Sequence, residues 1–351
     1  MNPHQIIPET ITETNLKIMN CQKETVQNRK MKQIQLTREP IRKNPQMNKS
    51  KKSISGSGSF IKTNESAVIG ILGNTSKFVV SELLNYITDI LDRNNLKYLI
   101  EKNLASYSNF KKKSVVCNES DILENSDFIF SLGGDGTFLN SARIVKNKNI
   151  PILGINLGRL GFFSEIAPKE FENFISKFIA GKFRITEQVL LKSVTDGKKI
   201  LYGLNDIVID KDDSVRTLET ETYFNNEKVV NIISDGVIIS TPAGSTGYSM
   251  SCNGPILNPD SKVFLITPIS PHTLNVRPIV IPDDGNILIK IPDTGKARII
   301  ADGQKFFRTK TPSEVSITKA DFKIKVIKKN SSTYFDTLKK KLFWNMDKRY
   351  S

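Results

Sequence analysis

The chain has 351 residues, of which 38% are hydrophobic and 25% are charged, and its formal net charge is +15. This length allows two domains with cores of their own, and the composition is typical of a globular protein rather than a fibrous one. No apolar run approaches the roughly 20 residues of a membrane span, and the three cysteines are too far apart for metal-ligand spacing. We therefore expect a cytoplasmic protein with reduced thiols and no membrane partner.

The first part of the chain carries much of the positive charge. Residues 1–60 contain eleven Lys or Arg, four Glu and no Asp, and they end in the run SISGSGS at residues 53–59. A segment of this composition buries too little apolar surface to fold on its own. We expect residues 1–65 to be a disordered basic extension whose charge is solvated. Nucleic-acid binding through this charge is the alternative, although we expect no nucleic-acid partner.

Residues 66–182 alternate between strand-like and helix-like patterns. Short apolar runs predict buried strands over residues 67–72, 97–100, 128–132 and 150–156. Apolar residues at helical spacing predict helices over residues 77–93, 137–145 and 168–178. Strands that alternate with helices form a parallel sheet with helices on its faces, so we expect a Rossmann-like α/β domain here.

The helical signal largely disappears after residue 182. Short strand patterns follow at residues 200–202, 206–209, 219–224, 229–233, 237–240, 263–266, 287–291, 297–300 and 322–326. Many short strands with regular turns predict a sandwich-like all-β domain over residues 183–330. Residues 331–351 contain the amphipathic pattern TYFDTLKKKLF at 333–343, which predicts a closing helix that returns to the α/β domain.

The stretch FIFSLGGDGTFLNSARIV at residues 128–145 places one carboxylate inside a glycine turn, between a strand and a helix. Free backbone N–H groups at such a helix start favour a phosphate, and glycines let it approach closely. Asp135 would repel a phosphate, so it needs another role. It could cap the helix, bind a metal, or accept a proton from a hydroxyl that attacks phosphorus. A simple capped turn accounts for a lone GGDG equally well.

The motif GGDGT resembles the signature shared by NAD kinases, diacylglycerol and sphingosine kinases, and 6-phosphofructokinases. Three later stretches resemble NAD kinases in particular, namely GINLGRLGF at 154–162, LNDIVI at 204–209 and SDGVIISTPAGSTGYSMSCNGPI at 234–256. The DGQ of residues 302–304 and the closing YFDTLKKKLFW of residues 334–344 continue the match in order. The resemblance extends over both expected domains and is most like the bacterial forms.

The resemblance implies a kinase that transfers the γ-phosphoryl group of ATP, or of another donor, to the 2′-hydroxyl of the adenosine ribose of NAD, which gives NADP. Asp135 corresponds to the family's catalytic aspartate, the proton acceptor. Gly133, Gly134, Gly136 and Thr137 would bind the phosphates of ATP through backbone N–H groups and one hydroxyl. Mg²⁺ would enter with ATP and offset its charge, with no set of protein ligands of its own.

The NAD-binding residues that the resemblance implies lie mostly in the second domain. Asn205 suits an adenine edge, Asp206 suits ribose hydroxyls and Asp235 suits the nicotinamide carboxamide. Arg216 would meet the pyrophosphate. The full set is Asp135, Gly136, Phe162, Asn205, Asp206, Arg216, Asp235, Thr246, Gly247, Tyr248, Ser251 and Gln304.

Some of these positions have simpler interpretations. Phe162 suits an apolar core as well as a pocket wall, and Arg216 lies in a charged loop where it would be solvated. Asp302-Gly303 is a common turn pair. Ile233 stands where many family members have Arg, so we expect one phosphate or intersubunit contact to be missing.

The resemblance also implies a homo-oligomer, a dimer or tetramer, with NAD and ATP as substrates. Two other functions stay open. A lipid kinase of the same superfamily would need an exposed apolar entrance. It would not need the Asn-Asp element (Asn205 and Asp206) or the GSTGYS element (residues 244–249). A nucleotide-binding sensor without catalysis is disfavoured by the intact GGDGT. The sequence does not choose between ATP and polyphosphate as donor, or between NAD and NADH as acceptor.

Overall fold

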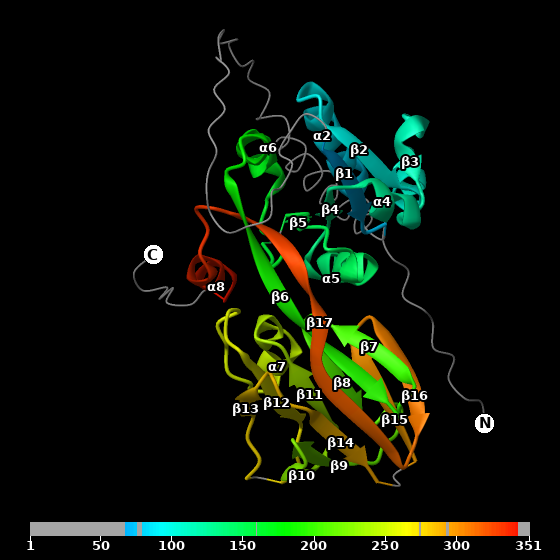
Figure 1. Cartoon of the computed structure of the whole chain (residues 1–351), viewed down its shortest axis with the longest axis vertical. Coiled ribbons are helices and arrows are strands. Elements are labelled where there is room, and N and C mark those ends of the chain that lie inside the picture. The colour runs from blue at the N-terminus through cyan, green and yellow to red at the C-terminus, as the bar shows by residue number, and fades with distance from the viewer. Residues whose placement is uncertain (1–66, 76–78, 159, 274, 293–294, 343–351) are drawn as a thin grey trace, which may run out of the picture. The chain divides into compact units, whose positions relative to one another are not determined.

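The computed structural model describes residues 67–75, 79–158, 160–273, 275–292 and 295–342 (Figure 1). The disordered extension expected over residues 1–65 lies outside the described residues, as does the last residue of the predicted closing helix. The described residues form two β-sheets, one of eleven strands and one of six. None of the described helices is both long and apolar enough to cross a bilayer.

The N-terminal part of the first sheet is parallel. Its strands are β1 (Val68–Gly73), β2 (Lys97–Glu101), β3 (Val116–Cys117), β4 (Phe128–Leu132) and β5 (Ile152–Ile155), in the order β3-β2-β1-β4-β5. The interiors of β1, β4 and β5 are buried and apolar except for Ser131 in β4, as expected for a parallel sheet with both faces covered. The Rossmann-like α/β domain is therefore confirmed.

Helices cover this parallel sheet. They are α2 (Val79–Arg93), α3 (Lys102–Tyr107), α4 (Glu119–Asn125), α5 (Asp135–Val145) and α6 (Phe171–Ile179), with short 3-10 turns η1 (Lys113–Val115), η2 (Lys146–Lys148) and η3 (Pro168–Glu170). Aromatic rings of β4 and α6 meet edge to face, with centroids 6.0 Å apart for Phe130 and Phe171 and 5.0 Å apart for Phe128 and Phe178. This packing fixes β4 against α6, and the glycine turn follows the end of β4.

Two long strands carry the first sheet into the second half of the chain. β6 (Phe183–Thr195) and β17 (Ser313–Lys329) pair with each other in antiparallel fashion, and β17 also pairs with β5 at Val326 and Ile152. Figure 1 shows both strands running from the α/β region into the β-rich region. The sequence pattern predicted only residues 322–326 of β17 and no strand at β6, because polar and charged residues interrupt both. The division of the chain at residues 182 and 330 stays a prediction.

The described residues between β6 and β17 form a β-sandwich together with these two strands. The first sheet continues with β14 (Ile287–Ile291), β9 (Leu218–Phe224), β10 (Glu227–Ser234) and, beside β6, β7 (Lys199–Gly203). The second sheet is antiparallel, in the order β13 (Ile279–Pro282), β12 (Val263–Ile269), β11 (Gly236–Ser240), β8 (Asp206–Asp210), β15 (Lys296–Ala301) and β16 (Lys305–Lys310). Ile207 and Ile239 share a buried core with Ile289 and Ile317 of the first sheet. The sandwich-like domain is confirmed, and β13 and β16 add two strands that were not predicted.

A final helix, α8 (Tyr334–Leu342), follows β17. A reciprocal cap starts it, because Asp336 N donates to Thr333 Oγ1 (3.1 Å) and Thr333 N donates to Asp336 Oδ2 (3.3 Å). Thr337 and Leu338 are buried on one face. Lys341 lies on the same face, since residues three and four apart on a helix are neighbours. The predicted closing helix is confirmed over its described part.

Candidate active site

The glycine turn, residues 133–136, follows the end of β4 and includes the start of α5. Gly133 N donates to Ile155 O of the neighbouring strand (2.9 Å), and the N–H groups of Thr137 and Phe138 donate to Gly134 O. A Cβ on Gly133 would lie 2.1 Å from Thr137 Oγ1, whereas one on Gly134 would meet nothing within 4 Å. Gly134 therefore borders open space, while the Thr137 hydroxyl lies against Gly133 and Thr137 is only 9% exposed.

Asp135, the first residue of α5, points its carboxylate at the loop that follows β5. Oδ2 accepts a hydrogen bond from Phe162 N (2.8 Å), and Oδ1 accepts from Phe163 N (3.0 Å) and Ser164 N (3.1 Å). Gly161 makes this approach possible, because a Cβ there would lie 2.0 Å from Oδ1. The carboxylate is thus held by a neighbouring loop rather than by the first turn of its own helix.

A lysine from α8 completes the environment of Asp135. Lys341 Nζ lies 2.9 Å from Asp135 Oδ2 and 4.9 Å from the centroid of the Phe162 ring. Burial favours the neutral carboxyl, but Lys341 and the backbone N–H groups outweigh it, so the pKa of Asp135 is lowered from its ordinary value. The carboxylate is ionised at neutral pH and is a weak base, which can accept a proton only late in a transfer.

The turn of residues 302–304, between β15 and β16, touches two of the predicted site elements. Gln304 Nε2 donates to Gly136 O (2.6 Å). The buried Asp302 carboxylate accepts from the N–H groups of residues 204–206 at 2.7 to 3.1 Å. This turn therefore joins the glycine turn to the Asn-Asp element. Asp302 was not in the predicted set, because an Asp-Gly pair is expected in any tight turn.

The Gly-Ser-Thr-Gly turn of residues 244–247, which overlaps η4 (Ala243–Thr246), packs directly on the Asn-Asp element. A Cβ on Gly244 would lie 2.0 Å from Asn205 O, and one on Gly247 would lie 3.6 Å from Asn205 Nδ2 and 3.9 Å from Asp206 Oδ2. Asn205 Oδ1 is buried and has no hydrogen-bond partner among the described residues. Buried amide oxygens are normally paired, so this atom is available to a donor group of a ligand.

Asp206 lies in an environment that favours its protonated form. It is 5% exposed. Burial, together with the nearby Asp302 carboxylate, raises the pKa of Asp206 from 3.8 to about 7. The folded protein therefore binds this proton more tightly than the unfolded chain does. The resulting stabilisation is complete below the unfolded pKa and is lost as the pH rises through the folded one.

Asp206→Asn should remove this pH dependence. We expect the free energy of unfolding of the variant, relative to the wild type, to rise by up to roughly 4 kcal/mol between about pH 4 and pH 7, since one pKa unit is worth about 1.36 kcal/mol. Urea unfolding at several pH values measures this difference, and the comparison cancels the titration of other carboxylates. A difference that stays constant over this range would contradict the raised pKa of Asp206.

Tyr248 lies within electrostatic reach of both Asp206 and Asp235. It begins α7 (Tyr248–Ser251) and is 46% exposed. Burial raises the pKa of its hydroxyl, and carboxylates that include Asp206 and Asp235 add to the rise. Asp235 itself follows β10, at the far end of the β8–β11 pairing from Asp206, where Lys211 Nζ lies 2.7 Å from its Oδ1.

Arg216 and Ser251 lie apart from the cluster. Arg216 is exposed in the loop between β8 and β9, where its backbone N–H donates to Ser214 Oγ (3.0 Å). Ser251 is exposed at the end of α7. Within the described part of the chain, no hydrogen bond or ion pair joins either side chain to the glycine turn or to the Asn-Asp element. Their assignment to an NAD site stays a prediction.

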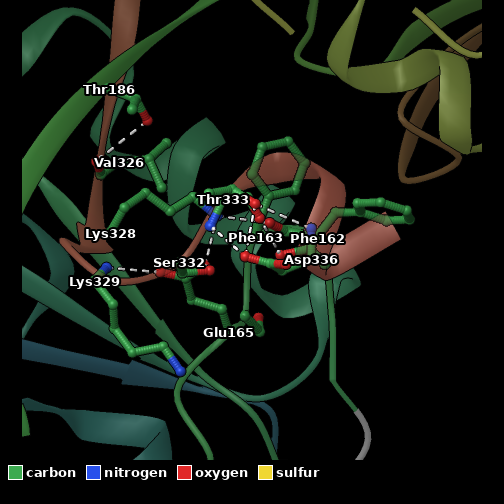
Figure 2. Close-up of polar contacts among 12 residues, drawn as sticks. Phe162, Phe163, Glu165, Thr186, Val326, Lys328, Lys329, Ser332, Thr333 and Asp336 are labelled. Atoms are coloured by element: carbon green, nitrogen blue, oxygen red, sulfur yellow. Dashed lines mark hydrogen bonds and ion pairs between the residues drawn. The ribbon is translucent and has the colours of Figure 1, made fainter. Parts of the chain in front are cut away.

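A cavity of about 440 Å³ lies beside Phe162. Its walls include Thr246 and Tyr334, whose ring centroid lies 6.4 Å from that of Phe162. The buried Glu165 and the partly buried Lys328 also line it. Lys328 Nζ donates to Phe162 O (2.7 Å) and lies 3.6 Å from Glu165 Oε2 (Figure 2). Phe162 is thus a half-buried residue in the wall of this cavity. Lys328 and Glu165 belong to no sequence motif, so they were not predicted.

Two family models match the chain. The model described as the ATP-NAD kinase N-terminal domain matches residues 69–183, and the model described as the ATP-NAD kinase C-terminal domain matches residues 204–329. The NAD kinase of Flavobacterium psychrophilum is 35% identical over 292 residues, which are 80% of this chain and 99% of that protein. The NAD kinase of Bacteroides fragilis is 36% identical over 288 residues, which are 80% of this chain and 98% of that protein.

Two solved structures have a similar fold. A yeast NADH kinase complexed with NADH superposes with a TM-score of 0.73 at 23% identity, over 81% of this chain and 89% of that one. An NAD kinase from Archaeoglobus fulgidus in complex with ATP superposes with a TM-score of 0.64 at 25% identity, over 79% of this chain and 98% of that one. The likeness to the yeast protein is one of fold.

Proposed function

Because the chain belongs to the NAD kinase family, we propose that it transfers the γ-phosphoryl group of ATP to the 2′-hydroxyl of the adenosine ribose of NAD, which gives NADP. The hydrogen bonds of the 302–304 turn are the observation that supports this proposal. Through Asp302 the turn holds the Asn-Asp element, and through Gln304 it contacts Gly136, beside Asp135. An adenosine bound at the Asn-Asp element would therefore present its ribose to Asp135.

Asp135 acts in this proposal as the proton acceptor. Its carboxylate is oriented by three backbone N–H groups and by Lys341, and these contacts keep it ionised. A carboxylate of lowered pKa cannot deprotonate a free hydroxyl. The proton therefore moves late, after most of the bond between the γ-phosphorus and the bridging oxygen of ATP has broken. The hydroxyl becomes acidic as its oxygen bonds to phosphorus, and its proton then passes to Asp135.

The acceptor side of the site is formed by the Asn-Asp element and the Gly-Ser-Thr-Gly turn. The unpaired amide oxygen of Asn205 would accept from the adenine amino group, and the carboxyl of Asp206 would meet ribose hydroxyls. Thr246, Gly247 and Tyr248 would line the same pocket, with Phe162 and Gln304 at its border. Contacts of Asp235 with the nicotinamide amide, of Arg216 with the pyrophosphate and of Ser251 with NAD stay predictions.

The donor side is the glycine turn. Gly134 borders open space at the start of α5, where N–H groups and the helix dipole favour a phosphate. Gly133, Gly136 and Thr137 belong to the same proposed phosphate site. In this proposal Mg²⁺ enters with the donor as MgATP and offsets the charge of the triphosphate. The described residues contain no group of three or more His, Cys, Asp or Glu side chains placed to hold a metal ion.

A homo-oligomer and a cytoplasmic location are also part of this proposal. β10 and β13 each lie at the end of a sheet. Each exposes an apolar side chain, with Ile233 44% and Val280 45% exposed. Strand edges that carry exposed apolar side chains are surfaces that a second subunit can cover.

Purified protein given NAD, ATP and Mg²⁺ is expected to form NADP, which an NADP-specific dehydrogenase detects in the presence of NAD. Excess EDTA should stop the reaction, because the charge of the triphosphate is then no longer offset, and added Mg²⁺ should restore it. Parallel assays with NADH and with polyphosphate identify the preferred acceptor and donor. Phosphorylation of a diacylglycerol without formation of NADP would contradict the proposal and favour a lipid kinase.

A further inference from the structure

The last described turn of α8 places a lysine against the proposed proton acceptor. Lys341 Nζ lies 2.9 Å from Asp135 Oδ2, the same oxygen that accepts from Phe162 N. The Phe162 ring also faces the ammonium group, with 4.9 Å between Nζ and the ring centroid. The lysine side chain is 31% exposed and the aspartate side chain 24%, so water and salt screen this pair less than an ordinary surface ion pair.

The position of Lys341 is fixed by the rest of α8. The reciprocal cap starts the helix, and its buried face holds it against the protein. Tyr334 OH donates to Leu257 O (3.0 Å), and Leu257 N in turn donates to Ser245 Oγ (3.0 Å) in the Gly-Ser-Thr-Gly turn. One end of α8 is therefore tied to the proposed NAD-binding turn, and the other end contacts Asp135.

The other charges that face Asp135 are engaged elsewhere. From β17, Lys328 Nζ donates to Phe162 O (2.7 Å) and lies 3.6 Å from Glu165 Oε2, in the loop after β5. Burial lowers the pKa of Lys328, while the charges of Glu165 and Asp135 act in the opposite direction. Lys328 thus neutralises Glu165, and within the described residues Lys341 is the cation in direct contact with Asp135.

We propose that Lys341 is a positioning residue for phosphoryl transfer, which holds the Asp135 carboxylate ionised and aimed at the acceptor hydroxyl. The inference rests on the function proposed above. A buried carboxyl tends to keep its proton, and a protonated Asp135 could not accept another. The ammonium group counteracts this tendency, because an opposite charge beside a carboxylate favours its ionised form.

The test compares Lys341→Met and Lys341→Arg with Lys340→Met. Lys340 is the adjacent, exposed lysine of the same helix, so its variant controls for the change in net charge. We expect Lys341→Met to lower kcat by about 10- to 100-fold, as the loss of a charged hydrogen bond does. The KM for NAD should change little, because the lysine acts through Asp135. Lys341→Arg should recover part of kcat, and Lys340→Met should match the wild type.

The pH dependence supplies a second readout. Without the ammonium group the pKa of Asp135 rises, so the acid limb of the kcat profile should move to higher pH in Lys341→Met. NMR titration of isotope-labelled aspartate, with the Asp135 signal assigned by its loss in Asp135→Asn, should show the same shift without turnover. Lys341→Gln replaces Lys341→Met if thermal melting shows that the methionine variant does not fold.

The outcomes separate the two proposals. No NADP from the wild type would overturn the proposed function itself. NADP formation by the wild type, with an unchanged kcat in Lys341→Met, would overturn only the role of Lys341. A lowered kcat with an unmoved acid limb and an unmoved Asp135 titration would also overturn it, because the lysine would then not act through the carboxylate.

Discussion

Asp135→Asn is expected to lower kcat for NADP formation by about 10²- to 10⁴-fold, the usual contribution of a general base. The amide has the shape of the carboxylate but cannot take the proton of the ribose hydroxyl. It also lacks the charge that Lys341 faces, and its N–H atoms would oppose backbone N–H groups of residues 162–164. NAD should still bind, because the Asn-Asp element and the Gly-Ser-Thr-Gly turn are unchanged.

Steady-state kinetics and calorimetric titration with NAD separate turnover from binding in this variant. Asp89→Asn is the matched control, because Asp89 is exposed on α2 and the substitution removes the same charge. Wild-type kcat in Asp135→Asn would remove the carboxylate from the chemistry. Loss of NAD binding together with loss of the fold would instead make Asp135 a structural residue.

Gly161→Ala is expected to have an effect of comparable size, although it alters no functional group. A Cβ at this position would lie 2.0 Å from Asp135 Oδ1 and 2.7 Å from Asp135 Cγ. Either the carboxylate leaves the N–H groups of residues 162–164, or the loop carries these groups away from it. A displacement of a reacting group by about 1 Å can cost roughly 10²-fold in rate, so we expect at least that loss in kcat.

Gly70→Ala is the control for the packing effect of an added methyl group. Gly70 lies in β1, where a Cβ would lie 2.4 Å from Ile122 Cγ2 in the apolar core. This variant should lose stability in thermal melting and keep its kcat per folded molecule. Gly161→Ala should lose kcat even at temperatures where it is folded. Unchanged kcat in Gly161→Ala, or an equal loss in both variants, would contradict the role assigned to the loop around Asp135.

Elements with a strong local pattern could be predicted from the sequence. β1, β4 and β5 are short, almost wholly apolar runs because both faces of the parallel sheet are buried, and α2 has one apolar face. β6 could not be predicted, because the segment FRITEQVLLKSVT mixes polar and apolar residues without strict alternation. The length of β17 is set by its partners, since one end pairs with β5 and the other with β14. Such pairings depend on contacts distant in sequence.

The candidate site could be predicted where a motif carries the chemistry. Asp135, Asn205 and Asp206 belong to such motifs, and the structure brings the glycine turn and the Asn-Asp element to the same 302–304 turn. Lys341 lies in the closing stretch of residues 334–344 that matches the family, but the sequence does not show that this lysine contacts Asp135, which lies 206 residues away. The backbone donors to Asp135 left no sequence signal either, since any residue has an N–H group.

The position of the transferred phosphate tests the central claim most directly. The product that the wild type makes from NAD and ATP would be purified and compared with authentic NADP by phosphorus NMR. We predict one phosphomonoester, on the 2′-oxygen of the adenosine ribose, formed by the wild type and not by Asp135→Asn. A phosphate on the 3′-oxygen or on the nicotinamide ribose would contradict the placement of the 2′-hydroxyl at Asp135. The absence of any phosphomonoester would contradict the kinase activity itself.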